Sequence, residues 1–451
     1  MINWRSNYAF TLHREDNSRW SEAKLILGSF LIILLVGTLF LVQPSSHKGE
    51  VTVINALFTA TSAISVTGLG VVDTGTAFTL QGQIILLILM EIGGLGQMTM
   101  TLLLIAMFSK RVGLRQQVLA KEALGQEGSV NIVQLVKRIV LFALIAQLIG
   151  TAIMAIRWVP DMGWGHGLYV SFFHAVSAFN NAGFSLFANN LMDYRDDPII
   201  SLTIPALLIL GGVGFTVIVD LVRNRRWRKL KLHSKLMLLM TPALLLLGTL
   251  MFWLLEHNNP GTLGNASFGS QWLAAFFQSA TARTAGFNTV DIGQMVPASL
   301  LFMMMLMFIG AGATSTGGGI KVTTFAVVLL ATRAFLTKRP HVTAFGRTLS
   351  PQIVTRSLAI IIVSTMVLML AMFLLMLTES QSFDKIMFET ISAFATVGLS
   401  TGITASLSEP GKLILVLVMI CGRLGPLTLA IMLARPVETR IRYPEESVYT
   451  G

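Results

Sequence analysis

The chain has 451 residues, of which 53% are hydrophobic and only 12% are charged. Because soluble domains carry about 25% charged residues, this composition excludes a soluble enzyme and a disordered chain. The single cysteine, Cys421, also excludes a scaffold held by disulfides. We therefore predict an all-α polytopic membrane protein. In a soluble protein the net charge of +11 would suggest a nucleic-acid partner, so the placement of the basic residues decides what this charge means.

Eight apolar segments approach the ~20 residues that a helix needs to cross a bilayer. The first 24 residues carry four basic side chains and no short apolar stretch with a cleavage site, so we expect a cytoplasmic tail rather than a secretory signal. Eight crossings would place both termini on the same side of the membrane. The predicted spans are 25–42, 80–108, 139–156, 199–222, 236–255, 300–335, 358–377 and 413–433.

The basic residues separate by side when the loops are assigned alternately. One side, which includes both tails, receives 25 of the 33 Lys and Arg, and the other side receives six. The positive-inside rule places the 25 in the cytoplasm, so no nucleic acid is needed to explain the charge. Twelve of the 22 acidic residues fall on the outer side. They would attract cations to an entrance, or they merely reflect outer loops that are poor in Lys and Arg.

A glycine followed by Leu or Phe ends a short apolar stretch four times, at spacings of 115, 103 and 112 residues. Such periodicity predicts a repeated unit, here a first span (M1), a short pore helix, a glycine turn and a second span (M2). We expect four fused M1–pore helix–M2 repeats around a pseudo-fourfold pore, with eight crossings and four re-entrant loops. The glycines are Gly68, Gly183, Gly286 and Gly398, in repeats 25–110, 111–230, 231–345 and 346–435, between the cytoplasmic tails 1–24 and 436–451.

Each pore helix has about ten residues, which is too few to cross, so the chain must turn back inside the membrane. Non-helical backbone at that depth needs cover from protein or a water-filled cavity. A ring of backbone carbonyls in such a cavity can replace the hydration shell of K⁺. The alternative, that the glycines only end helices at the membrane surface, does not explain four copies in register. The predicted K⁺-binding filter is Val66, Thr67, Gly68, Asn181, Ala182, Gly183, Thr284, Ala285, Gly286, Thr396, Val397 and Gly398.

The four glycine motifs carry a family resemblance. SVTGL (65–69), NNAGF (180–184), RTAGF (283–287) and ATVGL (395–399) resemble the degenerate filter signatures of the Trk/Ktr/HKT superfamily of potassium transporters. The resemblance covers residues 20–435 and is specific because the motif recurs in all four repeats. The short N-terminal tail and eight crossings are similar to the KtrB branch, the membrane subunits of bacterial Ktr systems. The Trk branch usually carries two additional N-terminal spans.

This resemblance implies K⁺ uptake across the bacterial inner (cytoplasmic) membrane, with both termini cytoplasmic. It also implies a homodimer docked on a KtrA-type nucleotide-binding ring, so ATP, ADP or NAD would act only through that partner and this chain would bind no cofactor. The candidate docking surfaces are the basic loops 109–138, 223–235 and 333–356, which would equally suit anionic lipid. Some members depend on Na⁺, and nothing in the residues decides between Na⁺ coupling, H⁺ coupling and gated diffusion. The alternative is a Trk-type proton-coupled or Na⁺-permeable cation transporter.

The second span of the third repeat is interrupted. Residues 300–335 would form a helix about 54 Å long against a hydrocarbon core of ~30 Å. The glycine-rich segment GAGATSTGGGIK (310–321) will not hold a regular helix there. We expect an intramembrane loop below the filter, which resembles the gating loop of the KtrB family. The predicted gate comprises Gly310, Gly312, Ala313, Thr314, Ser315, Thr316, Gly317, Gly318, Gly319, Lys321 and Arg423.

Arg423 breaks a glycine pattern that three second spans share, GGLGQMT (93–99), GGVGFTV (211–217) and GRLGPLT (422–428). Close helix packing explains the glycines. An arginine at this depth costs several kcal/mol unless it is paired, so it is a candidate functional residue. Its possible partners are Glu91 and the carbonyls of the third repeat, and a purely structural role between helices remains an alternative.

Other interpretations are weaker. A phosphate-binding loop at 310–321 lacks the Lys-Ser/Thr pair and a preceding strand. We expect no enzyme, because the seven histidines are scattered and no GxSxG or HExxH motif occurs. His174 is expected to be a packed helix residue. Arg283, three residues before its glycine, either holds a filter loop from behind or reaches outward to the membrane surface.

Overall fold

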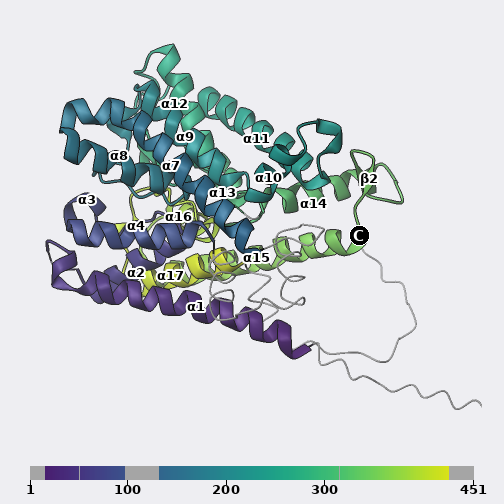
Figure 1. The fold of residues 1–451 in the computed structure, drawn as a ribbon, viewed down its shortest axis with the longest axis horizontal. Helices are drawn as coiled ribbons and strands as arrows, with labels where there is room; N and C mark the ends of the chain where they lie inside the picture. The colour runs from purple at the N-terminus through teal and green to yellow at the C-terminus, as the bar shows by residue number, and fades with distance from the viewer. Residues whose placement is uncertain (1–15, 50, 97–131, 314, 426–451) are drawn as a thin grey trace, which may run out of the picture.

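The computed structural model describes residues 16–49, 51–96, 132–313 and 315–425. In this part of the chain the structure is mostly helical, as predicted (Figure 1). The strands found there are the two-residue β1 (Thr343–Ala344) and β2 (Arg347–Thr348), which form one antiparallel hairpin. The rest of the predicted span 80–108, most of the basic loop 109–138, residues 1–15 of the predicted N-terminal tail, the C-terminal tail and Thr314 of the predicted gate lie outside the described residues.

The helices follow the same order in each of the four predicted repeats: a first helix, a shorter helix that ends just before the glycine turn, and a third helix after it. The first repeat has α1 (Asp16–Val42), α2 (Val53–Ile64), α3 (Thr74–Ala77) and α4 (Leu80–Gly94), and the second has α7 (Ile132–Met162), α8 (Trp164–Phe179), α9 (Pro198–Gly212) and α10 (Phe215–Arg223). The third has α11 (Leu232–Glu256), α12 (Phe268–Thr281), α13 (Pro297–Phe308) and α14 (Val322–Leu336), and the fourth has α15 (Pro351–Thr378), α16 (Phe383–Ala395) and α17 (Glu409–Leu424).

The third helix of each repeat begins at a sequence signal. Thr79, Asp197 and Ser408 are N-caps whose side-chain oxygens accept hydrogen bonds from backbone N–H groups in the first turns of α4, α9 and α17. Proline occupies one of the first two helical positions of α9, α13 and α17, where its missing N–H has no intrahelical partner to lose. The chain therefore starts a new helix a short distance after each glycine turn.

Three helices among the described residues are long and apolar enough to cross a membrane: α7 from Val136, α11 and α15. A fourth crossing is possible if the bent pair α9 and α10 is counted as one span. The apolar helices Leu27–Val42, α2, α4, α13 and α14 are shorter. The described helices therefore establish a helical membrane protein, and the count of eight crossings stays a prediction.

The predicted continuous span 199–222 is wrong in one respect, because α9 and α10 meet at an angle of 88°. Gly214 lies at the break with a φ of +98°, a conformation that glycine adopts without a steric cost. The last carbonyls of α9 have hydrogen-bond partners outside the helix. The carbonyls of Gly211 and Gly212 accept hydrogen bonds from Thr316 N (3.3 Å) and Gly312 N (2.9 Å) of the loop before α14. The bend is thus completed by a segment about 100 residues later in the chain, which local sequence does not reveal.

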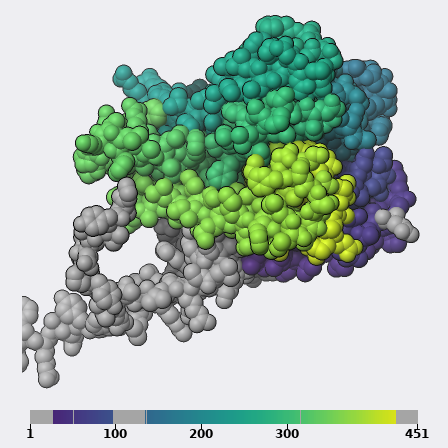
Figure 2. All heavy atoms as spheres, turned by 180° about the vertical axis from the view of Figure 1, so that it is seen from behind, coloured from purple at the N-terminus to yellow at the C-terminus, as the bar shows by residue number. Residues whose placement is uncertain are grey.

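The repeats pack in a cycle. The third helix of each repeat contacts the short helix of the next: α4 packs on α8, α9 on α12, α13 on α16, and α17 returns to α2. Figure 2 shows this closure from behind, with the yellow C-terminal helices lying against the purple N-terminal ones. The first and last described parts of the chain are therefore neighbours, and the four short helices lie inside a closed arrangement.

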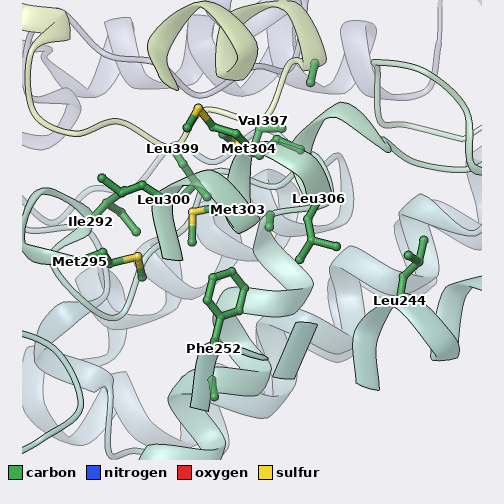
Figure 3. Close-up of a cluster of buried hydrophobic side chains, with 14 of the residues drawn as sticks. Leu244, Phe252, Ile292, Met295, Leu300, Met303, Met304, Leu306, Val397 and Leu399 are labelled. Atoms are coloured by element: carbon green, nitrogen blue, oxygen red, sulfur yellow. The ribbon is translucent and has the colours of Figure 1, made fainter. Parts of the chain in front are cut away.

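The apolar core is divided among four clusters that follow the repeats. The largest joins repeats 3 and 4, where Met303, Met304 and Leu306 of α13 are buried together with Val397 and Leu399 (Figure 3). Outward faces of the long helices instead carry exposed Leu, Ile, Met and Phe side chains. Because large exposed apolar surfaces are unfavourable in water, these faces fit a lipid environment.

Candidate functional site

The four predicted filter glycines lie in a ring. A Cβ atom built on Gly68 would lie 2.6 Å from the carbonyl oxygen of Ala182, and one on Gly183 would lie 2.7 Å from that of Ala285. One on Gly286 would lie 2.6 Å from the Val397 oxygen. One on Gly398 would lie 2.0 Å from the oxygen of Thr67, which precedes Gly68 and closes the ring. Each glycine therefore faces the carbonyl that precedes the next glycine, and no larger residue fits without a shift of the backbone.

Each filter segment also contains a second residue with positive φ, two positions before the glycine. The φ angles are +49° at Val66, +59° at Asn181, +71° at Thr284 and +51° at Thr396. Side chains other than glycine rarely adopt this conformation, and β-branched residues least of all. Four such residues at one repeat position indicate a backbone that the surrounding packing holds against its local preference. The sequence contains no direct signal of this conformation, although its fourfold position is readable once the glycines are aligned.

The short helices hold the turns through side chains that recur with the repeat. Ser62 and Ser392, six residues before their glycines, accept hydrogen bonds from the backbone N–H of Gly68 (3.0 Å) and Gly398 (3.1 Å). Ser177 is buried at the same position of repeat 2, and its hydroxyl has no partner among the described residues. The serine that recurs at this position therefore positions two of the four glycines.

The glycines of the second-span motif allow close packing. Cβ atoms built on Gly93, Gly211 and Gly422 would each lie within about 2 Å of a carbonyl oxygen, at 2.1, 1.9 and 1.8 Å. These oxygens belong to residues at one repeat position, the fourth before each filter glycine: Ile64, Phe179 and Phe394. The shared glycine motif thus brings the third helix of a repeat against the end of its own short helix.

The glycine-rich loop between α13 and α14 lies against the filter segments. A Cβ on Gly317 would meet Thr284 Oγ1 at 2.1 Å, and one on Gly318 would meet Thr396 Oγ1 at 2.1 Å. Thr316 Oγ1 lies 3.3 Å from Asn181 Oδ1. The loop therefore touches three of the four residues with positive φ, and its glycines permit this close approach.

The two ends of the loop are tied together. Gly310 N donates to the carbonyl of Ile320 (2.8 Å), and Val322 N donates to that of Ala311 (3.2 Å). Lys321, at the start of α14, donates from Nζ to the carbonyls of Gly317 (2.7 Å) and Gly318 (3.4 Å). The loop is thus closed at its base by backbone hydrogen bonds, and the ammonium group of Lys321 binds two of its carbonyls.

Arg423 links this loop to the first repeat. Its Nη1 donates to the carbonyl of Thr316 at 2.6 Å, and its Nη2 donates to the carbonyl of Gly93. Glu91, the other candidate partner, instead accepts hydrogen bonds from Asn180 Nδ2 (2.6 Å) and Gln147 Nε2 (2.9 Å). The guanidinium is therefore held by backbone carbonyls from repeats 1 and 3.

Arg283 and His174 are both buried. Arg283 lines a small pocket with Leu208, Thr241 and Ala311, where its Nη1 donates to the Thr241 carbonyl at 3.4 Å. Arg283 therefore lies behind the turn of repeat 3 and does not reach outward. His174 of α8 is packed between aromatic rings. The centroid of its ring lies 4.9 Å from that of Trp158 and 5.1 Å from that of Phe187.

Fold and site together define a helical membrane protein built around four glycine turns and a loop that lies against them. A model of the TrkH cation transport protein family matches residues 7–441, and the chain belongs to this family. It is 59% identical to the Ktr system potassium uptake protein B of Vibrio alginolyticus, over 97% of both chains. It is 43% identical to the Bacillus subtilis protein of the same name, over 98% of this chain and 100% of the relative.

Two further comparisons extend these relationships. The potassium/sodium uptake protein NtpJ of Enterococcus hirae is 38% identical, over 98% of this chain and 99% of the relative. The crystal structure of the potassium transporter TrkH from Vibrio parahaemolyticus matches with a TM-score of 0.75, over 94% of this chain and 86% of that chain. At 20% identity this structural match shows a common fold.

Proposed function

We propose that this protein takes up K⁺ across the bacterial cytoplasmic membrane through a filter of backbone carbonyls at Gly68, Gly183, Gly286 and Gly398. The closed ring of glycines carries the proposal, because each glycine faces a carbonyl of the next repeat. Rings of carbonyl oxygens can replace the hydration shell of K⁺. The names of the relatives from Vibrio alginolyticus and Bacillus subtilis, potassium uptake proteins, support the same substrate.

The membrane arrangement that we propose has eight crossings and four re-entrant loops around a pseudo-fourfold pore. The cyclic packing of each third helix on the next short helix supports it. The excess of Lys and Arg in alternate loops supports cytoplasmic termini. In this arrangement α2, α8, α12 and α16 are the pore helices and end at the filter.

The loop 310–321 and Arg423 form the proposed gate. Thr316, Gly317 and Gly318 lie against three filter segments, so a cation that leaves the filter would meet the loop. Arg423 fixes the loop through the Thr316 carbonyl and adds a positive charge that opposes cation passage. Displacement of the loop, which requires release of this hydrogen bond, would open the path.

Regulation is proposed from the family resemblance of the filter motifs. A homodimer on a cytoplasmic ring of nucleotide-binding subunits would displace the loop when ATP, ADP or NAD binds to the ring. Of the basic surfaces suited to such a partner, 223–235 and 333–356 lie among the described residues. Na⁺ dependence is the proposed mode of coupling, and one relative is named a potassium/sodium uptake protein. A Trk-type proton-coupled or Na⁺-permeable transporter is the second candidate.

Rubidium uptake into vesicles that contain the purified protein and its partner tests the substrate, the filter and the coupling together. We expect uptake that K⁺ inhibits, that Na⁺ stimulates, and that Gly398→Asp abolishes. Rescue of a bacterium lacking K⁺ uptake on low-K⁺ medium provides the test in cells. An intact protein that reaches the membrane with its partner and neither takes up rubidium nor rescues growth contradicts the proposed function.

A further inference from the structure

The position nine residues before each filter glycine differs among the repeats. It holds Thr59, His174, Phe277 and Glu389 in chain order. In repeats 2 and 4 this side chain hydrogen-bonds to the serine two residues after the glycine. His174 Nε2 lies 3.0 Å from Ser185 Oγ, and Ser400 Oγ donates to Glu389 Oε1. In both repeats the short helix thus holds the chain on the far side of the filter glycine.

Glu389 makes the more extensive connection. Its side chain is 1% exposed. Oε1 also accepts from the backbone N–H of Thr401 (3.1 Å), and Oε2 accepts from Thr404 Oγ1 (3.0 Å). Ser400 Oγ in turn accepts from the N–H of Gly402 at 2.9 Å. A buried carboxyl group that several donors of one segment satisfy fixes that segment, because each lost hydrogen bond leaves a buried polar group without a partner.

Gly398 is therefore held from both sides by the same helix. Ser392 of α16 accepts from the N–H of Gly398, and Glu389 of α16 binds residues 400–404 directly after it. The ion pairs found among the described residues do not involve Glu389, whose partners are hydroxyl and backbone groups. The contacts of this carboxyl group are thus directed to the filter segment and not to a balancing cation.

Repeats 1 and 3 lack such a connection at this position. Thr59 Oγ1 donates to the Asn55 carbonyl of its own helix (2.8 Å), and Phe277 has no hydrogen-bonding group. Because the repeats follow each other around the ring, repeats 2 and 4 lie on opposite sides of it. From this position two opposite segments are held, one by a histidine and one by a carboxyl group. In repeat 3 the short helix holds the chain from other positions, since Thr281 Oγ1 donates to the Phe287 carbonyl (2.6 Å) and Gln278 Nε2 donates to Thr289 Oγ1 (3.4 Å). A buried carboxyl group that binds several donors beyond the glycine is found at Glu389 of repeat 4.

We propose that Glu389 is a positioning residue of the filter, which holds residues 398–401 at the geometry that discriminates K⁺ from Na⁺. This inference rests on the proposed K⁺ filter. Carbonyl rings select between ions of different size through the number and placement of their oxygens, and loosening one of four segments disturbs both. Loss of Glu389 therefore weakens discrimination and does not merely lower the amount of folded protein.

The test measures inhibition of rubidium uptake by K⁺ and by Na⁺ in vesicles that contain the full-length protein and its partner. Glu389→Ala is expected to lower the ratio of K⁺ to Na⁺ affinity by about three- to tenfold, the factor that corresponds to one net hydrogen bond. Glu389→Gln keeps one acceptor oxygen and is expected to fall between Glu389→Ala and the unchanged protein. Ser400→Ala removes a single hydroxyl and is expected to lower the ratio in the same direction.

Glu256→Gln is the matched control. Glu256 is also 1% exposed and accepts from Thr262 Oγ1 (2.6 Å), Asn259 Nδ2 (2.7 Å) and Val296 N (3.0 Å), none of which belongs to a filter segment. The ratio of K⁺ to Na⁺ affinity in Glu256→Gln is expected to match that of the unchanged protein. An unchanged ratio in Glu389→Ala and Ser400→Ala at normal membrane levels overturns the proposal, as does an equal loss in Glu256→Gln. If Glu389→Ala does not insert, Ser400→Ala decides alone.

The same vesicles separate this inference from the proposed function. Unchanged protein that shows no rubidium uptake inhibited by K⁺ contradicts the K⁺ filter itself. Normal uptake, a defective Gly398→Asp and a Glu389→Ala with the original ratio contradict the role of Glu389 alone.

Discussion

Arg423 donates a hydrogen bond of 2.6 Å to the carbonyl of Thr316, a residue 107 positions earlier in the chain. The same guanidinium donates to the carbonyl of Gly93 in repeat 1. One side chain of the last described helix thus joins the third repeat to the first, beside the loop that lies against the filter. If this loop is a gate, the stability of its closed arrangement depends on Arg423.

Replacement of Arg423 by alanine is therefore expected to raise K⁺ flux. Hydrogen bonds to a charged group contribute about 1.5–3 kcal/mol, so losing the one to Thr316 should increase flux by about tenfold or more. Removal of the charge acts in the same direction, because a fixed cation repels K⁺. Rubidium flux in vesicles without the regulatory partner measures the effect. Arg423→Lys, which keeps the charge but cannot reach both carbonyls as a planar donor, should give an intermediate flux.

The contradicting result for Arg423 is equal or lower flux from a correctly inserted alanine variant. That outcome would support the structural role between helices. A double variant that also shortens 310–319 provides a check, since loop and arginine act on one step. Its flux should not exceed that of the shortened loop alone by the full effect of Arg423→Ala.

A methyl group on Gly318 should also displace the loop. It would lie 2.1 Å from Thr396 Oγ1, far inside van der Waals contact. Overpacking of this kind costs about 1–3 kcal/mol, so Gly318→Ala is expected to raise rubidium flux by about fivefold or more. Gly269→Ala is the matched control, because no atom lies within 4 Å of a Cβ built there in α12. Unchanged flux in Gly318→Ala would mean that the loop does not lie in the permeation path.

The main outline of the fold follows from the sequence because its signals are local. Composition, the lengths of the apolar segments and the glycine spacing are readable without tertiary contacts, and the helical membrane protein with its repeats was predicted from them. The order of helices around each glycine turn follows from the same signals. The serine before the glycine also makes a local contact, since Ser62 of α2 accepts a hydrogen bond from Gly68 N, only six residues later in the chain.

Other features depend on partners that are distant in sequence. The bend after Gly212 is completed by the N–H groups of Gly312 and Thr316. The positive φ of Val66 opposes the preference of a β-branched residue and needs the surrounding ring. The partner of Arg423 was left open between Glu91 and the third repeat. Donors from Asn180 and Gln147 occupy Glu91, and only the tertiary structure shows this.

Alanine variants of two glycines after the pore helix of repeat 4 can distinguish the effect of backbone strain from the effect of contact within the glycine ring. Gly398 and Gly402 have nearly the same positive φ, +90° and +93°. A Cβ on Gly398 would lie 2.0 Å from the Thr67 oxygen, whereas one on Gly402 would have no atom within 4 Å. Both alanine variants pay a strain of about 1–2 kcal/mol. Only Gly398→Ala is expected to lose discrimination of K⁺ over Na⁺ in rubidium competition. An equal loss in both variants would mean that the contact of Gly398 with the Thr67 carbonyl does not determine selectivity.

Glu91 should stabilise the contact between repeats 1 and 2. Its Oε2 accepts from Asn180 Nδ2 at 2.6 Å and from Gln147 Nε2 at 2.9 Å, so it joins α4 to α7 and to the end of α8. Alanine at this position would leave the Gln147 amide without this acceptor, at a cost of about 1–3 kcal/mol. The thermal unfolding temperature in detergent is therefore expected to fall.

Glu91→Gln supplies the control for this prediction, since its amide oxygen can still accept both hydrogen bonds while the charge is lost. Its unfolding temperature should lie closer to that of the unchanged protein than that of Glu91→Ala does. Gln147→Ala, which removes one of the two donors, should fall between them, because Asn180 still binds the carboxylate. If Glu91→Ala unfolds at the same temperature as the unchanged protein, the hydrogen bonds of Glu91 do not hold α4 in place. Packing of Gly93 and Gly94 on the short helices would then hold it.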